Sequence, residues 1–294
     1  MSILNPLRTP GPADAGLPMR AYRSVRGTPA RWALYGRITA LNFKAQASYR
    51  GEFLLGLLFG LVWQGALVLF AGVLLLRFPG LGGWTQGDVL LIAAMRLLSH
   101  GGYVAFFPNV SNLSFLVQQG NVDGYLLRPL PLYRQVLLAR FPINSLGDLL
   151  AGVGVFAVAL ARLDVAWTPV KALYVAAGII GGMLVEGSLQ TALSIAAFRF
   201  TGLATWTAWV DETLSTYGNY PLNVLPGAVR GTLTFGLPLA FIAYLPASIV
   251  TGHAGTTGVP AWLAAASPAV GLLLFLAVKA GWYGSVRWYQ SPGG

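Results

Sequence analysis

The amino-acid sequence predicts an all-α polytopic membrane protein with six transmembrane helices. Of its 294 residues, 55% are hydrophobic and only 10% are charged, and the mean hydropathy is +0.64. A soluble domain carries about 25% charged residues, so this composition does not supply a water-exposed surface. The apolar residues fall in blocks of about 20, the length that a helix needs to cross the ~30 Å hydrocarbon core. Backbone groups in lipid must satisfy their own hydrogen bonds, which favours helices over the alternating pattern of a barrel.

Six apolar blocks are expected to form the spans. The fifth contains Pro238 and Pro246. Proline removes a backbone donor and breaks or kinks a helix, so we expect this span to be broken or partly re-entrant. The six blocks are residues 53–76, 88–107, 142–161, 172–197, 231–250 and 261–281.

Two segments precede the first block. Residues 1–30 are rich in proline and glycine and have no apolar core of signal-peptide length, which predicts a disordered cytoplasmic tail. Residues 31–50 carry an apolar stripe that includes Ile38 and Leu41, with Arg37 and Lys44 beside it. This pattern predicts an interfacial helix, and residues 31–294 as a whole form the expected membrane domain.

The positive charges predict the orientation. If both termini are cytoplasmic, fifteen of the 19 Lys and Arg residues lie in the termini and in the segments 108–141 and 198–230, and three lie on the opposite face. Because cytoplasmic loops carry the excess of Lys and Arg, both termini are expected in the cytoplasm. The net charge of +10 therefore follows the membrane topology and anionic lipid, and we do not expect nucleic-acid binding.

Several kinds of chemistry are excluded or disfavoured. The sequence has no cysteine, and none of its three lysines completes a Gly-Lys-Ser/Thr phosphate loop. Its two histidines are not part of an HExxH motif, and no Gly-x-Ser-x-Gly elbow is present. We therefore expect no catalytic residues, no metal site and no enzyme activity in this chain. Transport and scaffolding are the classes of function that remain.

Polar residues inside the predicted spans indicate where function is concentrated, because a charge in mid-bilayer costs about 2.5–3.5 kcal/mol. Arg96 lies near the centre of the second span with His100 one turn on, Glu186 lies near the centre of the fourth, and Asp148 lies toward the cytoplasmic end of the third. In the fourth span, small and polar residues repeat every four positions: Gly178, Gly182, Glu186, Gln190 and Ser194.

Two interpretations of this strip stay open. The strip either lines a substrate path or gate, or it is a packing seam with one buried ion pair between Arg96 and Glu186, which lie at matching depth. The first span has Gly56, Gly60 and Gln64 at the same spacing, and there we favour helix packing.

Three stretches resemble one family. Residues 118–134 read QQGNVDGYLLRPLPLYR, residues 220–247 contain a Tyr-Pro start and a Pro-Ala end, and the last residues read WYGSVRWYQSPGG. In this order they resemble the permease subunits of bacterial ABC-2 type exporters, in particular the small six-span branch. The proline- and glycine-rich tail departs from that pattern. The residues that match the family's cytoplasmic motif are Gly120, Asp123, Gly124, Tyr125, Arg128 and Pro129.

The resemblance implies a permease that works with other chains. It implies separate ATP-binding cassette ATPase subunits, which would hold ATP and magnesium, a second permease that is identical or related, and export across the bacterial cytoplasmic membrane. The motif at 118–134 would then form a short coupling helix that contacts the ATPase. The competing interpretation of this segment is an interfacial loop that binds lipid headgroups. The competing function is an autonomous secondary transporter driven by an ion or proton gradient, although no convincing internal repeat supports it.

Overall fold

Helices make up almost all of the part of the chain that the structure describes. The structure is a computed structural model that describes residues 29–77, 80–107, 109–128, 130–139, 142–200 and 204–286. Within these residues the only strands are the two-residue antiparallel pair β1 (Gly80–Leu81) and β2 (Trp84–Thr85). The predicted all-α class is therefore confirmed. Residues 1–28 of the predicted tail lie outside the described residues, and residues 29 and 30 begin a helix.

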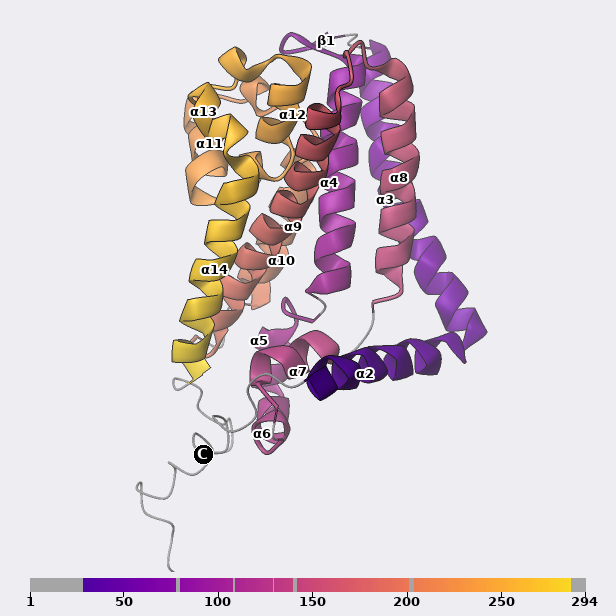
Figure 1. The fold of residues 1–294 in the computed structure, drawn as a ribbon, viewed down its shortest axis with the longest axis vertical. Coiled ribbons are helices and arrows are strands. Elements are labelled where there is room, and N and C mark those ends of the chain that lie inside the picture. Colours follow the sequence, from indigo (N-terminus) through magenta and orange to yellow (C-terminus); the bar gives the residue numbers. More distant parts are fainter. Residues whose placement is uncertain are drawn as a thin grey trace, which may run out of the picture.

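Within the described residues, four helices are long and apolar enough to cross a membrane: α4 (Gln86–Phe106), α8 (Asn144–Arg162), α9 (Pro169–Ala197) and α14 (Ser267–Ser285). The 28-residue helix α3 (Arg50–Arg77) packs against α8. In Figure 1 these five helices run roughly along the long axis of the molecule, with α4 in the middle. The second, third and fourth predicted spans correspond closely to α4, α8 and α9.

A helix lies across one end of this bundle. It is α2 (Pro29–Ala47), which covers most of the expected interfacial segment. Figure 1 shows α2 lying across the bottom of the bundle, beside the short helix α7 (Leu132–Leu138). The Asn42 side-chain amide donates a hydrogen bond of 2.6 Å to the Leu138 carbonyl and so joins the two helices.

Glycines allow the long helices to approach closely. A Cβ atom on Gly60 of α3 would lie 2.6 Å from a backbone oxygen of α8, and one on Gly147 of α8 would lie 2.5 Å from a backbone oxygen of α3. On the other side, a Cβ atom on Gly271 of α14 would overlap the carbonyl oxygen of Gly181 in α9. Membrane helices commonly use small residues in this way, because close backbone approach supplies van der Waals contact where lipid provides no hydrophobic driving force.

Three short helices form a compact segment between α4 and α8. They are α5 (Leu113–Gln118), α6 (Asn121–Leu126) and α7. Figure 1 places them at the same end of the molecule as α2 and the end of α14. Their apolar side chains pack with Phe198 at the end of α9 and with Trp282 of α14, which is 1% exposed. One short coupling helix was expected, and the structure has three.

The predicted fifth span, 231–250, is not one continuous helix. The segment is divided into the end of α11 (Gly227–Gly231), a π-helical turn η3 (Thr232–Gly236), a 3₁₀ turn η4 (Leu239–Phe241) and the eight-residue helix α12 (Tyr244–Thr251). Pro238 lies at the break, because it lacks an amide donor and disfavours helical geometry at the residue before it. Pro246 lies in the first turn of α12, where proline is tolerated. The expectation of a broken segment is confirmed.

A helix also occupies the segment 198–230, which the sequence analysis assigned to a cytoplasmic connection. This helix, α10 (Ala204–Tyr217), packs beside α9 and is followed by a 3₁₀ turn, η2 (Leu222–Val224). Fourteen residues span about 21 Å, which is shorter than the ~30 Å hydrocarbon core. The sixth predicted span, 261–281, is also displaced: residues 261–265 form the separate helix α13 (Ala261–Ala265), and α14 begins at Ser267.

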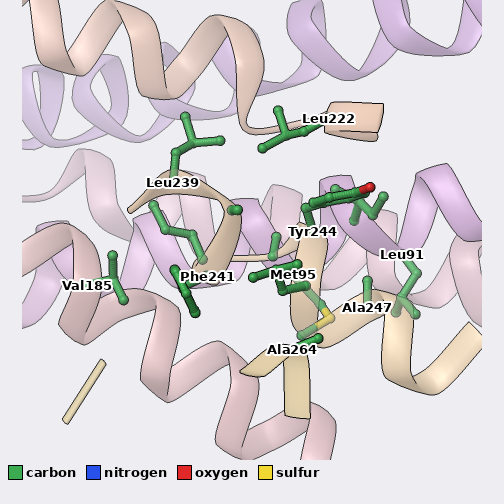
Figure 2. Packing of buried hydrophobic residues seen from close by; sticks show 14 of the residues in the cluster. Leu91, Met95, Val185, Leu222, Leu239, Phe241, Tyr244, Ala247 and Ala264 are labelled. Carbon is green, nitrogen blue, oxygen red and sulfur yellow. The ribbon is translucent and has the colours of Figure 1, made fainter. Parts of the chain in front are cut away.

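The segments between α10 and α14 gather at the end of the bundle opposite α5–α7, as Figure 1 shows. A further 3₁₀ turn, η5 (Ala254–Thr256), lies among them. Their apolar side chains form the main hydrophobic core with α4 and α9. Figure 2 shows Tyr244 and Ala247 of α12 packed with Leu91 and Met95 of α4. Because this core is internal, α12 contributes its apolar residues to protein packing, not to a lipid-facing surface.

The hairpin before α4 fixes the start of the central helix. Gly82 and Gly83 have positive φ angles of 61° and 90°, which turns between β1 and β2 require. Thr85 and Asp88 then form a capping box: the Thr85 hydroxyl accepts from the Asp88 amide, and the Asp88 carboxylate accepts from the Thr85 amide at 2.9 Å. This box satisfies amides that the first helical turn leaves free.

Candidate functional site

A buried ion pair lies at the centre of the bundle. Arg96 of α4 donates two hydrogen bonds to Glu186 of α9, from Nη1 to Oε2 at 3.0 Å and from Nη2 to Oε1 at 3.3 Å. The two residues are 3% and 0% exposed. Their fork-to-fork geometry is the strongest form of arginine–carboxylate pairing. The two side chains that the sequence places at matching depth therefore meet in the structure.

His100 completes this polar centre. Its Nδ1 lies 2.7 Å from Glu186 Oε1, and because a carboxylate accepts, the ring donates from Nδ1. The Arg96 Nε donates a longer hydrogen bond, 3.5 Å, to the carbonyl of Leu214 in α10. Three helices thus meet at Glu186 and Arg96: α4, α9 and α10. Asp148 forms no ion pair with these residues within the part of the chain that the structure describes. It is buried on α8, where its carboxylate faces Gly60 of α3.

The strip along α9 is engaged in packing within the chain over its whole length. A Cβ atom on Gly178 would touch Met95 and Pro246, and one on Gly182 would overlap the hydroxyl of Ser99. These contacts join α9 to α4 and to the broken segment. The geometry favours the packing seam over a path lined by this strip.

The two polar residues at the C-terminal end of the strip also form hydrogen bonds. The Gln190 side-chain amide donates to the carboxylate of Asp211 in α10, and the Ser194 hydroxyl donates to the carbonyl of Val110. Both residues are buried, at 0% and 3% exposure. Gln190 therefore connects α9 to α10, and Ser194 connects α9 to the segment that begins the short helices.

Asp211 is a polar residue of this region that the sequence analysis missed. The segment 198–230 was treated as a cytoplasmic connection, so its acidic residues were not compared with those of the spans. In the structure, residues 204–217 form a helix with Trp206 and Trp209 on an exposed face. Asp211 lies on the same helix and is only partly exposed.

Gly120 fixes the turn before α6, and side-chain contacts hold the chain between α6 and α7. Gly120 precedes α6 with φ = 70°, a left-handed conformation that favours glycine. After α6, the Gln135 side-chain amide donates to the carbonyls of Tyr125 and Leu130 at 2.8 and 2.7 Å. The Arg128 guanidinium lies 5.4 Å from the centre of the Tyr125 ring, within cation–π range.

The outer surface of this segment is partly apolar. Leu127 is 88% exposed, and its neighbour Leu126 is 43% exposed. A Cβ atom on Gly124 would meet nothing within 4 Å, so the chain's own packing does not require glycine there. Asp123 lies in the first turn of α6. Pro129, the last residue of the predicted coupling motif, lies outside the described residues.

These observations define a helical membrane protein whose central polar residues are enclosed in its bundle and whose short helices α5–α7 are gathered at one end. The chain matches the family model described as ABC-2 family transporter protein over residues 61–293. Because the match covers most of the chain, the protein belongs to the ABC-2 transporter family and is a membrane-spanning permease component, not the ATPase. The family resemblance seen in the sequence is thereby confirmed. No curated protein and no solved structure matches the chain.

Proposed function

We propose that this chain is the permease subunit of an ATP-driven exporter in the bacterial cytoplasmic membrane, coupled to separate ATPase subunits and paired with a second permease. The observation that carries the proposal is the family match over residues 61–293. The sequence contains no Gly-Lys-Ser/Thr phosphate loop, so ATP and magnesium would be held by the partner ATPase. The substrate path would lie between the two permeases, whose relative packing changes when the ATPases close on ATP.

We further propose six crossings with both termini in the cytoplasm. Five of the crossings are the single helices α3, α4, α8, α9 and α14. The remaining crossing, which comes between α9 and α14 in the chain, is composite. Its first part is α10, which enters from the side of α5–α7, and residues 218–265 reach the opposite side of the membrane and lead back to α14. The excess of Lys and Arg at both termini and near α5–α7 supports this orientation. Arg37 and Lys44 on α2 would then lie at anionic lipid headgroups.

The segment α5–α7 is the proposed contact with the ATPase, through the motif that contains Gly120, Asp123, Gly124, Tyr125, Arg128 and Pro129. Leu127 is 88% exposed at the end of α6. An exposed apolar side chain of this kind is favourable when a partner protein covers it. The core shared with Phe198 and Trp282 connects the segment to α9 and α14, so movement of α6 would reach two of the long helices. An interfacial loop bound to lipid is the competing interpretation.

A cross-linking experiment tests the proposal. A photoreactive amino acid is placed at Leu127, and illuminated membranes are examined for adducts of the tagged permease. We expect an adduct with an ABC-type ATPase of about 30–35 kDa, identified by its phosphate loop. The matched control is Leu173, which is 73% exposed near the opposite end of α9 and should give no ATPase adduct. Adducts at Leu127 with lipid alone would contradict the coupling role.

A further inference from the structure

A partly open pocket of about 420 Å³ lies beside the lower half of α4. Its wall includes Gln46 of α2, Glu52 and Gly56 of α3, His100 and Tyr103 of α4, and Asp211 of α10. The volume falls in the range of about 300–1,000 Å³ that small-molecule sites occupy. The residues from α2 and from the start of α3 are at the end of the bundle that holds the short helices, whereas His100 and Asp211 adjoin the buried ion pair.

The electrostatic character of this pocket is opposite to that of the chain. Lys and Arg outnumber Asp and Glu by 19 to 9 in the sequence. Among the described residues that line the pocket there is no Lys or Arg, and there are two carboxylates, Glu52 and Asp211, together with the imidazole of His100. Low-dielectric walls focus the field of such charges, so the pocket attracts cations despite the net charge of the protein.

No cation lies within ion-pair distance of Asp211 among the described residues, although His100 and Arg96 act on its carboxylate from farther away. The ion pairs found there join Glu186 to Arg96 and to His100, and Asp88 to His253. The guanidinium nearest to this region is therefore already paired with Glu186. The hydrogen bond that Asp211 accepts comes from the neutral amide of Gln190. A partly buried carboxylate with no cation in direct contact is costly in a membrane protein, and such residues commonly mark ligand sites.

Aromatic rings form another part of the wall. Tyr103 and Phe107 both line the pocket, and their rings are stacked with centroids 6.3 Å apart. The face of an aromatic ring attracts an organic cation and also packs against apolar groups. Together with the carboxylates, these rings match a cation that carries an apolar body. A metal ion would instead need a cluster of ligands, and no such cluster exists among the described residues.

We propose that this pocket binds an organic cation with an apolar body, with Asp211 and Glu52 as the countercharges. The role of this site rests on the proposed function, because in a permease such a site would receive the transported compound. The cation would be either a soluble amphiphile or the ammonium headgroup of a lipid. In either case, positive charge and apolar bulk are recognised together.

The test measures equilibrium binding to the purified full-length permease, without ATPase, in a polyoxyethylene detergent that carries neither charge nor sugar. The probes are tetraphenylphosphonium and tetraphenylborate, which have the same shape and opposite charge. We expect saturable binding of the phosphonium and none of the borate. Asp211→Asn should weaken phosphonium binding about tenfold or more, as loss of a charged contact does.

Glu212→Gln is the matched control, because Glu212 is the next residue on α10 and is exposed. It should change affinity less than about twofold, within the range of ordinary surface substitutions. Glu52→Gln tests the pocket independently at an exposed position where folding is not at risk, and it should also weaken binding. Addition of phosphatidylethanolamine, with phosphatidylglycerol as its control, separates the two sources: selective displacement of the probe assigns a lipid headgroup, and retention assigns a soluble amphiphile.

The proposal is overturned if well-folded Asp211→Asn and Glu52→Gln proteins bind the phosphonium as the wild type does, or if the borate binds equally. Displacement of the probe by maltose but not by other cations would assign the pocket to neutral sugars and would also overturn it. Because binding is measured on the permease alone, its failure leaves the ATPase partnership intact. Conversely, if the purified permease binds the phosphonium but no ATPase is found with the permease in the membrane, the proposed function is contradicted and the cation site stands.

Discussion

Changing Glu186 to glutamine should strongly destabilise the protein, because it leaves the buried Arg96 guanidinium without a countercharge. Arg96 is 3% exposed, so water cannot solvate the released charge. Three hydrogen bonds end on the carboxylate, at 2.7, 3.0 and 3.3 Å. A hydrogen bond to a charged group contributes about 1.5–3 kcal/mol. Glutamine keeps one acceptor oxygen, so part of this interaction survives. The expected loss is about 3–5 kcal/mol, the usual cost of removing one partner of a buried pair.

Thermal unfolding in detergent, followed by tryptophan fluorescence, measures this loss. At about 2–4 °C per kcal/mol, the apparent Tm of Glu186→Gln should fall by about 6–20 °C. The control Glu212→Gln alters an exposed carboxylate and should leave the Tm unchanged. The double variant Arg96→Gln/Glu186→Gln should be more stable than Glu186→Gln alone, since residues in contact do not act additively. A wild-type Tm for Glu186→Gln, or strictly additive losses in the double variant, would refute the reasoning.

Three further predictions concern the fold, the orientation and the coupling segment. Single cysteines at Val165 and Gly255 of this cysteine-free chain should react with an impermeant reagent from outside, and one at Tyr125 only from inside; outside labelling of position 125 would reverse the orientation. Gly271→Ala should lower stability by about 1–3 kcal/mol, because its Cβ would overlap the carbonyl oxygen of Gly181, whereas Gly284→Ala, where a Cβ meets nothing within 4 Å, should be tolerated; equal Tm values for the two would argue against close helix contact. Asp123→Ala or Arg128→Ala should leave the protein inserted and folded but uncouple ATP hydrolysis from transport, and unchanged coupling in both variants would contradict the role of α6.

Hydropathy predicted the long helices well and the broken segment poorly, for a physical reason. A window of apolar residues has the same hydropathy whether lipid or protein covers it. On α3 the leucines face outward, as Leu55 does at 69% exposure. The first predicted span, 53–76, therefore corresponds to a long helix, which packs beside α8. On α12, residues such as Tyr244 and Leu245 are 2% and 0% exposed, because they pack on α4 and α9. The apolar block at 231–250 therefore reflects a protein core.

The polar centre could be predicted only where its residues lay in recognised spans. Arg96 and Glu186 lie at similar depths in two long apolar helices, so the cost of an isolated charge made their pairing one of the two interpretations of the strip. Asp211 lies next to Glu212 in a helix that also contains several threonines, and the mean hydropathy of that stretch falls below that of a span. Its partnership with Gln190 depends on α10 returning alongside α9, which is a tertiary fact. Five separate segments of the chain line the pocket, so no local sequence pattern predicts it.

The central claim is that a separate ATPase drives this permease, and co-purification from the membrane tests it most directly. The tagged chain is extracted in mild detergent, and the complex is assayed for ATP hydrolysis and for the identity of its subunits. The account predicts an ABC-type ATPase of about 30–35 kDa in stoichiometric amount, a second copy of this chain or a related permease, and hydrolysis that is lost when the ATPase phosphate loop is mutated. A monodisperse, ATPase-free permease that moves its substrate in liposomes on an ion gradient alone would contradict it.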